Sequence, residues 1–152
     1  MKLAEALIQR ADAQKRIEQL RQRLARSAKV QEEEQPPEDP QELLREVDTV
    51  IAELTRLIQQ INRTNATTQF DDTRTVTDAL AERDTIMLKR GMLTGLIIQT
   101  QPQQRYGRME IKELPTVNIA DIQKQVDGIS RQYRELDTAI QRLNWTIDLI
   151  ED

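Results

Sequence analysis

The sequence contains no cysteine and no histidine. Without cysteine the chain has no disulfide, no thiolate zinc site and no cysteine nucleophile. Without histidine it lacks the side chain that most often binds transition metals and moves protons near neutral pH, which excludes Ser-His-Asp and Cys-His catalysis. Enzyme chemistry would therefore have to rest on carboxylates, lysine, arginine, tyrosine or hydroxyl groups.

Aromatic residues, glycine and proline are also scarce, with four aromatics, four glycines and five prolines in 152 residues. The glycines and prolines fall mostly between stretches of periodic apolar residues, a distribution typical of helical proteins. The net charge of -4 lacks the basic surplus of a general nucleic-acid binder, so we expect no nucleic-acid partner. The length predicts a single domain, residues 1–152.

Long apolar runs are missing as well. The longest, such as residues 96–98, are far shorter than the ~20 residues that cross a bilayer. Near the start, Glu5, Arg10 and Asp12 interrupt any apolar core of a signal peptide. We therefore predict a cytoplasmic protein that does not insert into a membrane.

What the sequence does have is apolar residues at three- and four-residue spacing, which predict an all-α fold. The four predicted helices lie at about residues 2–29, 40–65, 76–100 and 119–150. Asp39 before Pro40, Thr75 or Thr77, and Asn118 are suited to cap the last three of them. We expect long antiparallel helices in an elongated bundle or coiled coil.

Two segments interrupt the helical pattern. Residues 31–39 are acidic and rich in proline, which predicts a mobile linker, with a docking peptide for a basic partner as the alternative. The sequence leaves open whether this linker lets the first helix swap between subunits. Residues 100–118 form an irregular loop with room for a short strand near residues 109–114.

The helix predicted at residues 119–150 carries an apolar seam of more than four heptads, typical of a coiled coil. Such a seam is completed inside the chain or by another subunit, and we expect both, in a homo-oligomer whose copy number the sequence does not set. Gly91 and Gly95 lie four residues apart in the third helix, which indicates either close helix packing or a locally weakened helix.

Two acidic residues at the start of the third helix are candidate metal ligands. Asp78 and Glu82 are four residues apart and share a helix face, as a site for Mg²⁺ or Ca²⁺ requires. The alternative is that both offset the helix dipole and pair with Arg83 or another arginine.

Several polar residues near helix ends are candidates for ligand binding. The basic loop at residues 105–112 offers groups that could hold a phosphate or carboxylate. The sequence contains no glycine-rich phosphate-binding motif that would support this role. The alternative is that the basic side chains form ion pairs with acidic helix faces. A lone tryptophan near a helix end is more typical of a packing or interface anchor. The candidates are Asn62, Arg63, Asn65, Arg83, Arg105, Tyr106, Arg108, Lys112, Asn144 and Trp145.

Five separated segments carry a family resemblance: MKLAEALIQRADAQKRIEQLRQRL, INRTN, TDALAERD, RYGRMEIK and LNWTIDLIE. Together they resemble the septicolysin-like family of small bacterial helical proteins, in order and over nearly the whole chain. The resemblance implies an all-helical, oligomeric protein and assigns no catalytic residue. The absence of a membrane-length segment argues against the membrane attack that the family name suggests.

These observations predict a non-enzymatic helical oligomer with a structural or protein-interaction role. The alternative is a protein that binds a divalent metal or a phosphorylated ligand through the polar groups at helix ends, with hydrolysis of that ligand as an extension of this alternative.

Overall fold

The structure is a computed structural model that describes residues 1–102 and 111–152. Within these residues lie four helices: α1 (Leu3–Ser27), α2 (Pro40–Thr67), α3 (Val76–Gln99) and α4 (Ile119–Asn144). The predicted all-α fold is confirmed. Of the short strand predicted near residues 109–114, residues 111–114 are not in a strand, and the other two lie outside the described residues.

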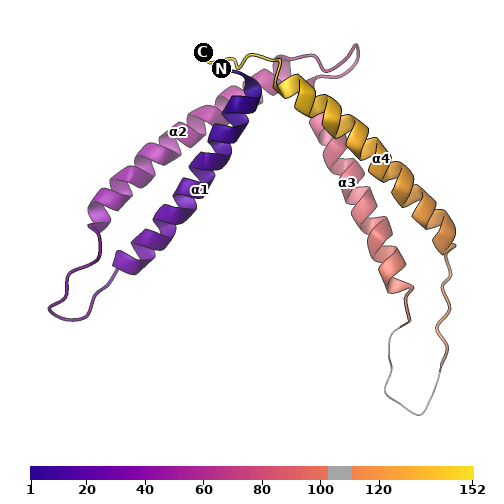
Figure 1. The fold of residues 1–152 in the computed structure, drawn as a ribbon, viewed down its shortest axis with the longest axis horizontal. Helices are drawn as coiled ribbons and strands as arrows, with labels where there is room; N and C mark the ends of the chain where they lie inside the picture. Colours follow the sequence, from indigo (N-terminus) through magenta and orange to yellow (C-terminus); the bar gives the residue numbers. More distant parts are fainter. Residues whose placement is uncertain (103–110) are drawn as a thin grey trace. The chain divides into compact units, whose positions relative to one another are not determined.

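The chain divides into two compact units. Unit 1 comprises Met1–Gln69 and Arg142–Asp152, and unit 2 comprises Phe70–Gln141. Each is built on an antiparallel pair of helices, α1 with α2 in unit 1 and α3 with most of α4 in unit 2 (Figure 1). The single domain expected from the sequence stays a prediction.

The predicted caps form as the sequence indicates. Asp39 accepts a hydrogen bond from the Gln41 amide at 2.9 Å, with Pro40 in the first position of α2. Thr75 accepts from the Asp78 amide at the start of α3, and Asn118 accepts from the Asp121 amide at the start of α4. These side chains satisfy amide groups that have no partner within the helix.

Unit 1 is held together by two apolar clusters along α1 and α2. One contains Leu20, Leu43 and Val50 near the α1–α2 connection, and partly buried Ile17, Val47 and Leu54 pack against it. The other contains Leu3, Ala6, Leu57 and Ile61 at the opposite end of the hairpin, where the C-terminal Leu149 joins it. Because apolar burial is the main favourable term in folding, these clusters fix the pairing of α1 with α2.

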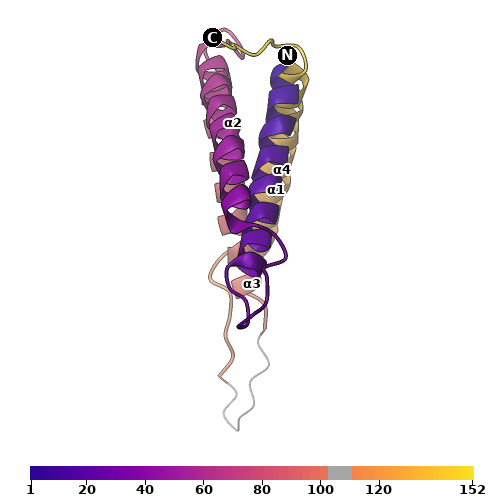
Figure 2. The same ribbon diagram turned by 90° about the vertical axis from the view of Figure 1, so that its left-hand side faces the viewer.

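A C-terminal strap, defined as residues 145–152, lies across the end of this hairpin (Figure 2). The Leu3 amide donates to the Ile147 carbonyl at 3.0 Å, and the Leu149 amide donates to the Met1 carbonyl at 2.8 Å. Farther along, the Ile150 amide donates to the Thr64 hydroxyl at 2.9 Å. The strap therefore joins the start of α1 to the end of α2.

The expectation that the fourth helix continues to residue 150 was wrong, because α4 ends at Asn144. The Leu143 carbonyl accepts hydrogen bonds from the Thr146 amide, the Thr146 hydroxyl and the Ile147 amide, which closes a turn. Beyond the turn the chain leaves the helix, and its amides donate to Met1, just before α1, and to Thr64 of α2 rather than to a further helical turn. The apolar residues at the end of the seam thus pack on unit 1 as a strap.

The acidic connection between α1 and α2 is attached to α1 at one point. The Glu38 carboxylate accepts two hydrogen bonds from Arg23, at 2.5 and 2.9 Å. The hydrogen bond from the Arg23 side chain lowers the pKa of Glu38. Mobility of residues 31–39 stays a prediction, and this ion pair limits it at the end near α2.

Unit 2 pairs α3 with α4 through a mixture of apolar and charged contacts. Four apolar side chains of α4 are buried, namely Ile122, Val126, Ile129 and Ile140. By contrast, only Val76 and Ala79 are buried in α3. Across the described residues, no helix has an apolar stretch long enough to cross a bilayer.

Candidate functional site

The start of α3 carries the most connected polar cluster of unit 2, centred on Arg74. Its guanidinium donates to Asp71 at 2.6 and 2.9 Å and to Glu82 at 2.5 Å. The Arg74 side chain also lies over the Phe70 ring, 4.9 Å from its centroid. Asp71 in turn accepts from the Thr73 and Arg74 amides, so the loop is folded around its carboxylate.

These contacts explain the electrostatics of the cluster. Hydrogen bonds from the Arg74 side chain, and then from the Thr73 amide, lower the pKa of Asp71 to about 2. The Asp71 and Glu82 carboxylates raise the pKa of Arg74. The cluster therefore stays a fixed arrangement of one cation and two anions near neutral pH.

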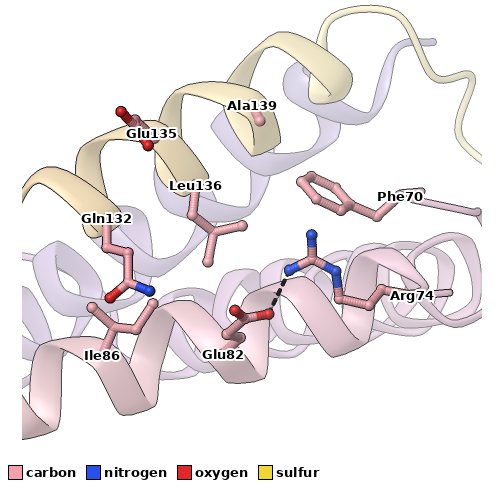
Figure 3. A pocket seen from close by; sticks show the side chains of 8 residues that line it. All are labelled: Phe70, Arg74, Glu82, Ile86, Gln132, Glu135, Leu136 and Ala139. Carbon is pink, nitrogen blue, oxygen red and sulfur yellow. Dashed lines mark hydrogen bonds and ion pairs between the residues drawn. The ribbon is translucent and has the colours of Figure 1, made fainter. Parts of the chain in front are cut away.

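An open pocket of about 300 Å³ lies beside this cluster, between α3 and α4 (Figure 3). Its α3 side is formed by Phe70, Arg74, Glu82 and Ile86, and its α4 side by Gln132, Glu135, Leu136 and Ala139. The only cation of this lining is already bonded to two carboxylates, and the lining adds a third carboxylate. The pocket thus has little attraction for a phosphate or carboxylate, and its lining holds no nucleophile with an adjacent base.

The two candidate metal ligands both serve local structure. Asp78 accepts hydrogen bonds from the Thr75 amide at 2.8 Å and the Thr75 hydroxyl at 3.0 Å, which lower its pKa. Glu82 accepts from Arg74. Among residues 1–102 and 111–152, no group of three or more acidic, histidine or cysteine side chains could hold a metal ion. The Mg²⁺ or Ca²⁺ site stays a prediction without further support from these contacts.

Arg83 joins α3 to α4 instead of facing a ligand. Its guanidinium donates to Asp137 of α4 at 2.9 Å, and it lies 3.7 Å from Asp84. Both side chains of the Arg83–Asp137 pair are partly buried. This contact fixes which side of α3 faces α4.

The candidates at the end of α2 lie in unit 1 and flank a residue that sequence reasoning missed. Asn62 and Arg63 are exposed and Asn65 is half-buried, but Thr64 is fully buried. The Thr64 hydroxyl donates to the Gln60 carbonyl and accepts from the Ile150 amide. A polar residue in step with the apolar stripe of α2 was the available signal.

Gln60 is a second buried polar residue at this end of α2. Its side-chain amide donates to the Glu151 carbonyl at 2.8 Å, and its carbonyl oxygen is buried without a hydrogen-bond partner. Gln60 and Thr64 thus hold the strap in place through its backbone.

The remaining candidates do not come together as one site in the described residues. Asn144 is buried at the last position of α4, whereas the next residue, Trp145, is 57% exposed. Lys112 is exposed in the loop that precedes α4. Arg105, Tyr106 and Arg108 lie outside the described residues. The predicted ligand cluster at helix ends is therefore divided between the two units wherever the structure describes it.

The outer face of α3 is the surface feature that stands out most. Five large apolar side chains of this helix are more than a third exposed: Met87, Leu88, Met92, Leu96 and Ile98. Leu88 and Met92 are the most exposed of them, at 66% and 70%. Exposed apolar side chains in such number on one helix usually mark an interaction site.

Comparison with known proteins places the chain in a family. The description "Family of unknown function (DUF6847)" applies to a profile that matches residues 10–149. The chain belongs to this family. The finding corrects the expected septicolysin-like resemblance, since nothing in the comparisons points to septicolysins. The quoted segments are short and consist mostly of polar and charged residues, a composition that is not specific enough to identify a family.

A solved structure of a protein of nearly the same length has the same fold. It is described as the crystal structure of a functionally unknown conserved protein from Corynebacterium diphtheriae. Its sequence is 44% identical, the match covers 99% of both chains, and the TM-score is 0.91. The search of curated proteins gives no match. The family match and the solved structure support the fold, and both descriptions give an unknown function.

Proposed function

We propose that this protein is a non-enzymatic structural protein that assembles with copies of itself, with unit 2 providing the assembly surface. The observation that carries the proposal is that the C-terminal half of α3 carries apolar side chains on nearly all sides. A helix of this kind is normally buried all round, yet this one leaves large apolar side chains exposed. An assembly that covers them would remove this surface from water.

The polar groups support a structural role better than catalysis. Several charged residues of unit 2 form ion pairs with one another, as Arg74 does with Glu82 and Arg83 does with Asp137. Such fixed pairs position helices and have no need of a substrate. Within this proposal the assembly is cytoplasmic and offers its polar helix faces to other protein partners.

The alternative, a protein that binds a divalent metal or a phosphorylated ligand, stays a prediction. The pocket beside Arg74 does not favour it, because that guanidinium is already bonded to two carboxylates.

Native mass spectrometry and sedimentation of the untagged protein test the proposal. We expect a multiple of the 17.7 kDa chain mass with no additional mass. Leu88→Glu should reduce this to one chain, because it places a charge on the exposed face of α3. Leu44→Glu is the matched control, since Leu44 is an exposed leucine of α2, 44% accessible, and its substitution should leave the assembly intact.

Three results would contradict the proposal. The first is a single-chain mass for the wild type at micromolar concentration. The second is an equal loss of assembly in the Leu44→Glu control. The third is a reproducible extra mass of a small ligand or ion on each chain, which would favour the alternative function.

A further inference from the structure

We infer that the occupant of the exposed α3 face is the α3 helix of a second copy, packed antiparallel, with Leu88 opposite Ile98 of the copy and Gly91 opposite Gly95. This inference rests on the proposed function and specifies its contact.

The contact stripe is defined by four positions: Leu88, Gly91, Gly95 and Ile98. At 3.6 residues per turn they fall within an arc of about 80° on one side of the helix. The stripe lies roughly 130° around the helix from Arg83 and Ile86, which face α4. It is therefore a face that the partner helix within the chain does not use.

The two glycines of the stripe have no packing role inside the chain. A Cβ atom added at Gly91 or Gly95 would meet nothing within 4 Å. Glycine in a helix interior is unfavourable compared with alanine, so two open glycines weaken α3 without any compensation in the single chain. Between two exposed apolar side chains, they provide a shallow groove into which another helix can pack closely.

The spacing of the stripe is self-complementary. Its steps of three, four and three residues are symmetric about Leu93. A two-fold axis at that position brings each glycine opposite the other glycine and each large side chain opposite the other one. An isologous contact of this kind needs the same patch on both copies, which a second copy supplies by definition.

The charges of α3 favour the antiparallel orientation. Asp78, Glu82 and Asp84 lie in its first part together with Arg83, which is paired with Asp137 of α4, whereas Lys89 and Arg90 are the only charges beyond them. A parallel copy would place acidic residues beside acidic residues and the basic pair beside itself. An antiparallel copy centred at Leu93 avoids both repulsions and buries no charge in the stripe.

The exposed apolar area near the stripe suits a weak, reversible pair. Met87, Leu88, Met92 and Ile98 lie within about 80° of the centre of the stripe, whereas Leu96 lies about 120° away. These four side chains are between 39% and 70% accessible. They offer on the order of 400 Å² per copy, or about 800 Å² for a pair, and contacts from the polar residues beside the stripe add to this area.

Because the chain has no cysteine, engineered cysteines report the register directly. We expect a mixture of Leu88→Cys and Ile98→Cys chains to form disulfide-linked dimers at least tenfold more than either variant alone. Efficient crosslinking of Leu88→Cys alone would indicate a parallel pair and overturn the inference.

Glycine variants provide a second, independent readout. Gly91→Ala with Gly95→Ala should raise the dissociation constant at least tenfold, although alanine strengthens the helix itself. Gly128→Ala is the matched control, because Gly128 is an exposed glycine of α4 whose Cβ would also meet open space. It should strengthen its helix and leave the dissociation constant unchanged. Unchanged association of the double variant would overturn the inference.

The outcomes separate this inference from the proposed function. A self-assembly that persists without the Leu88–Ile98 crosslink overturns the antiparallel pair and leaves the structural role standing. A single-chain mass for the wild type overturns both, and coverage of α3 by a different macromolecule in a stoichiometric complex overturns the choice of a second copy.

Discussion

The two helical hairpins of this protein differ in how their ends and faces are covered. In unit 1, α1 and α2 enclose Leu20, Leu57 and Ile61 almost completely, and the C-terminal strap lies across the open end. In unit 2, α3 buries only Val76 and Ala79, while Leu88 and Met92 remain exposed. Two helix pairs of similar length thus differ in burial: unit 1 covers most of its large apolar side chains within the chain, whereas unit 2 leaves several of those on α3 exposed.

This difference shows why composition alone does not identify a core. An antiparallel helix pair buries one stripe of each helix and leaves the outer faces in water. Along α1 and α2, unit 1 exposes only single apolar side chains at Ile8, Leu44 and Ile51, each about half accessible, and it adds the strap as a third element. Unit 2 places apolar residues on both sides of α3, which is consistent with a hairpin that needs a further layer.

The largest effect is expected from matched leucines in the two units. Leu57→Ala should lower the free energy of unfolding by about 2–5 kcal/mol at every protein concentration, because Leu57 is fully buried. Leu88→Ala should lower the free energy of unfolding by an amount that decreases on dilution, because Leu88 is exposed within one chain and would be buried only in the assembly. Urea denaturation over a hundredfold concentration range measures both. Equal, concentration-independent losses would remove the contrast between the units.

The strap supplies the next largest effect. Thr64→Val removes the hydroxyl that accepts the Ile150 amide and should cost about 1–3 kcal/mol. Thr67→Val is the control, since its hydroxyl is on the exposed side of α2 and bonds only to carbonyls of its own helix. Hydrogen exchange should show faster exchange of the Ile150 amide in Thr64→Val alone. Similar protection in both variants would mean that this bond does not hold the strap.

A smaller effect is expected from the ion pair that orients α3 against α4. A double-mutant cycle with Arg83→Met and Asp137→Asn should give a coupling of about 0.2–1 kcal/mol, because both side chains retain contact with water. The exposed Arg131–Glu135 pair within α4 is the comparison, and its coupling should be smaller. A larger value for Arg131–Glu135 would contradict the assigned role of Arg83.

The smallest effect concerns pH. Because Arg74 lowers the pKa of Asp71 from 3.8 to about 2, the ionised carboxylate stabilises the folded state above pH 3.8, and this contribution is lost as the pH falls towards 2. Asp71→Asn should therefore flatten the fall in thermal stability over that interval, whereas Asp72→Asn, at the exposed neighbouring position, should not. An unchanged slope in Asp71→Asn would show that the Arg74 contact is not maintained in solution.

Local signals in the sequence predicted the elements well. Apolar periodicity located four helices, and Asp39, Thr75 and Asn118 were found to cap them as expected. These features depend on residues within a few positions of one another, which is why a single sequence reveals them.

The features that depend on distant partners were not predictable in this way. The end of α4 was misplaced because Ile147 and Ile150 continue its heptad spacing, yet their backbone groups bond to residues more than 80 positions away. The candidate site was dispersed for the same reason. Polar residues such as Asn62, Arg83 and Asn144 share only a location near helix ends, and that does not decide which ends meet.

The strap also bears on the order in which the protein folds. Ile147 and Leu149 are synthesised after both hairpins, whereas their backbone partners, Leu3 and Met1, precede the first hairpin. The contacts of α3 with α4 close a much shorter loop, which is entropically cheaper and faster to form. Unit 2 is therefore expected to form before the strap binds to the ends of α1 and α2 in unit 1. Until Leu149 has been synthesised, the end of the first hairpin at Leu3, Leu57 and Ile61 lacks its cover and is available to chaperones.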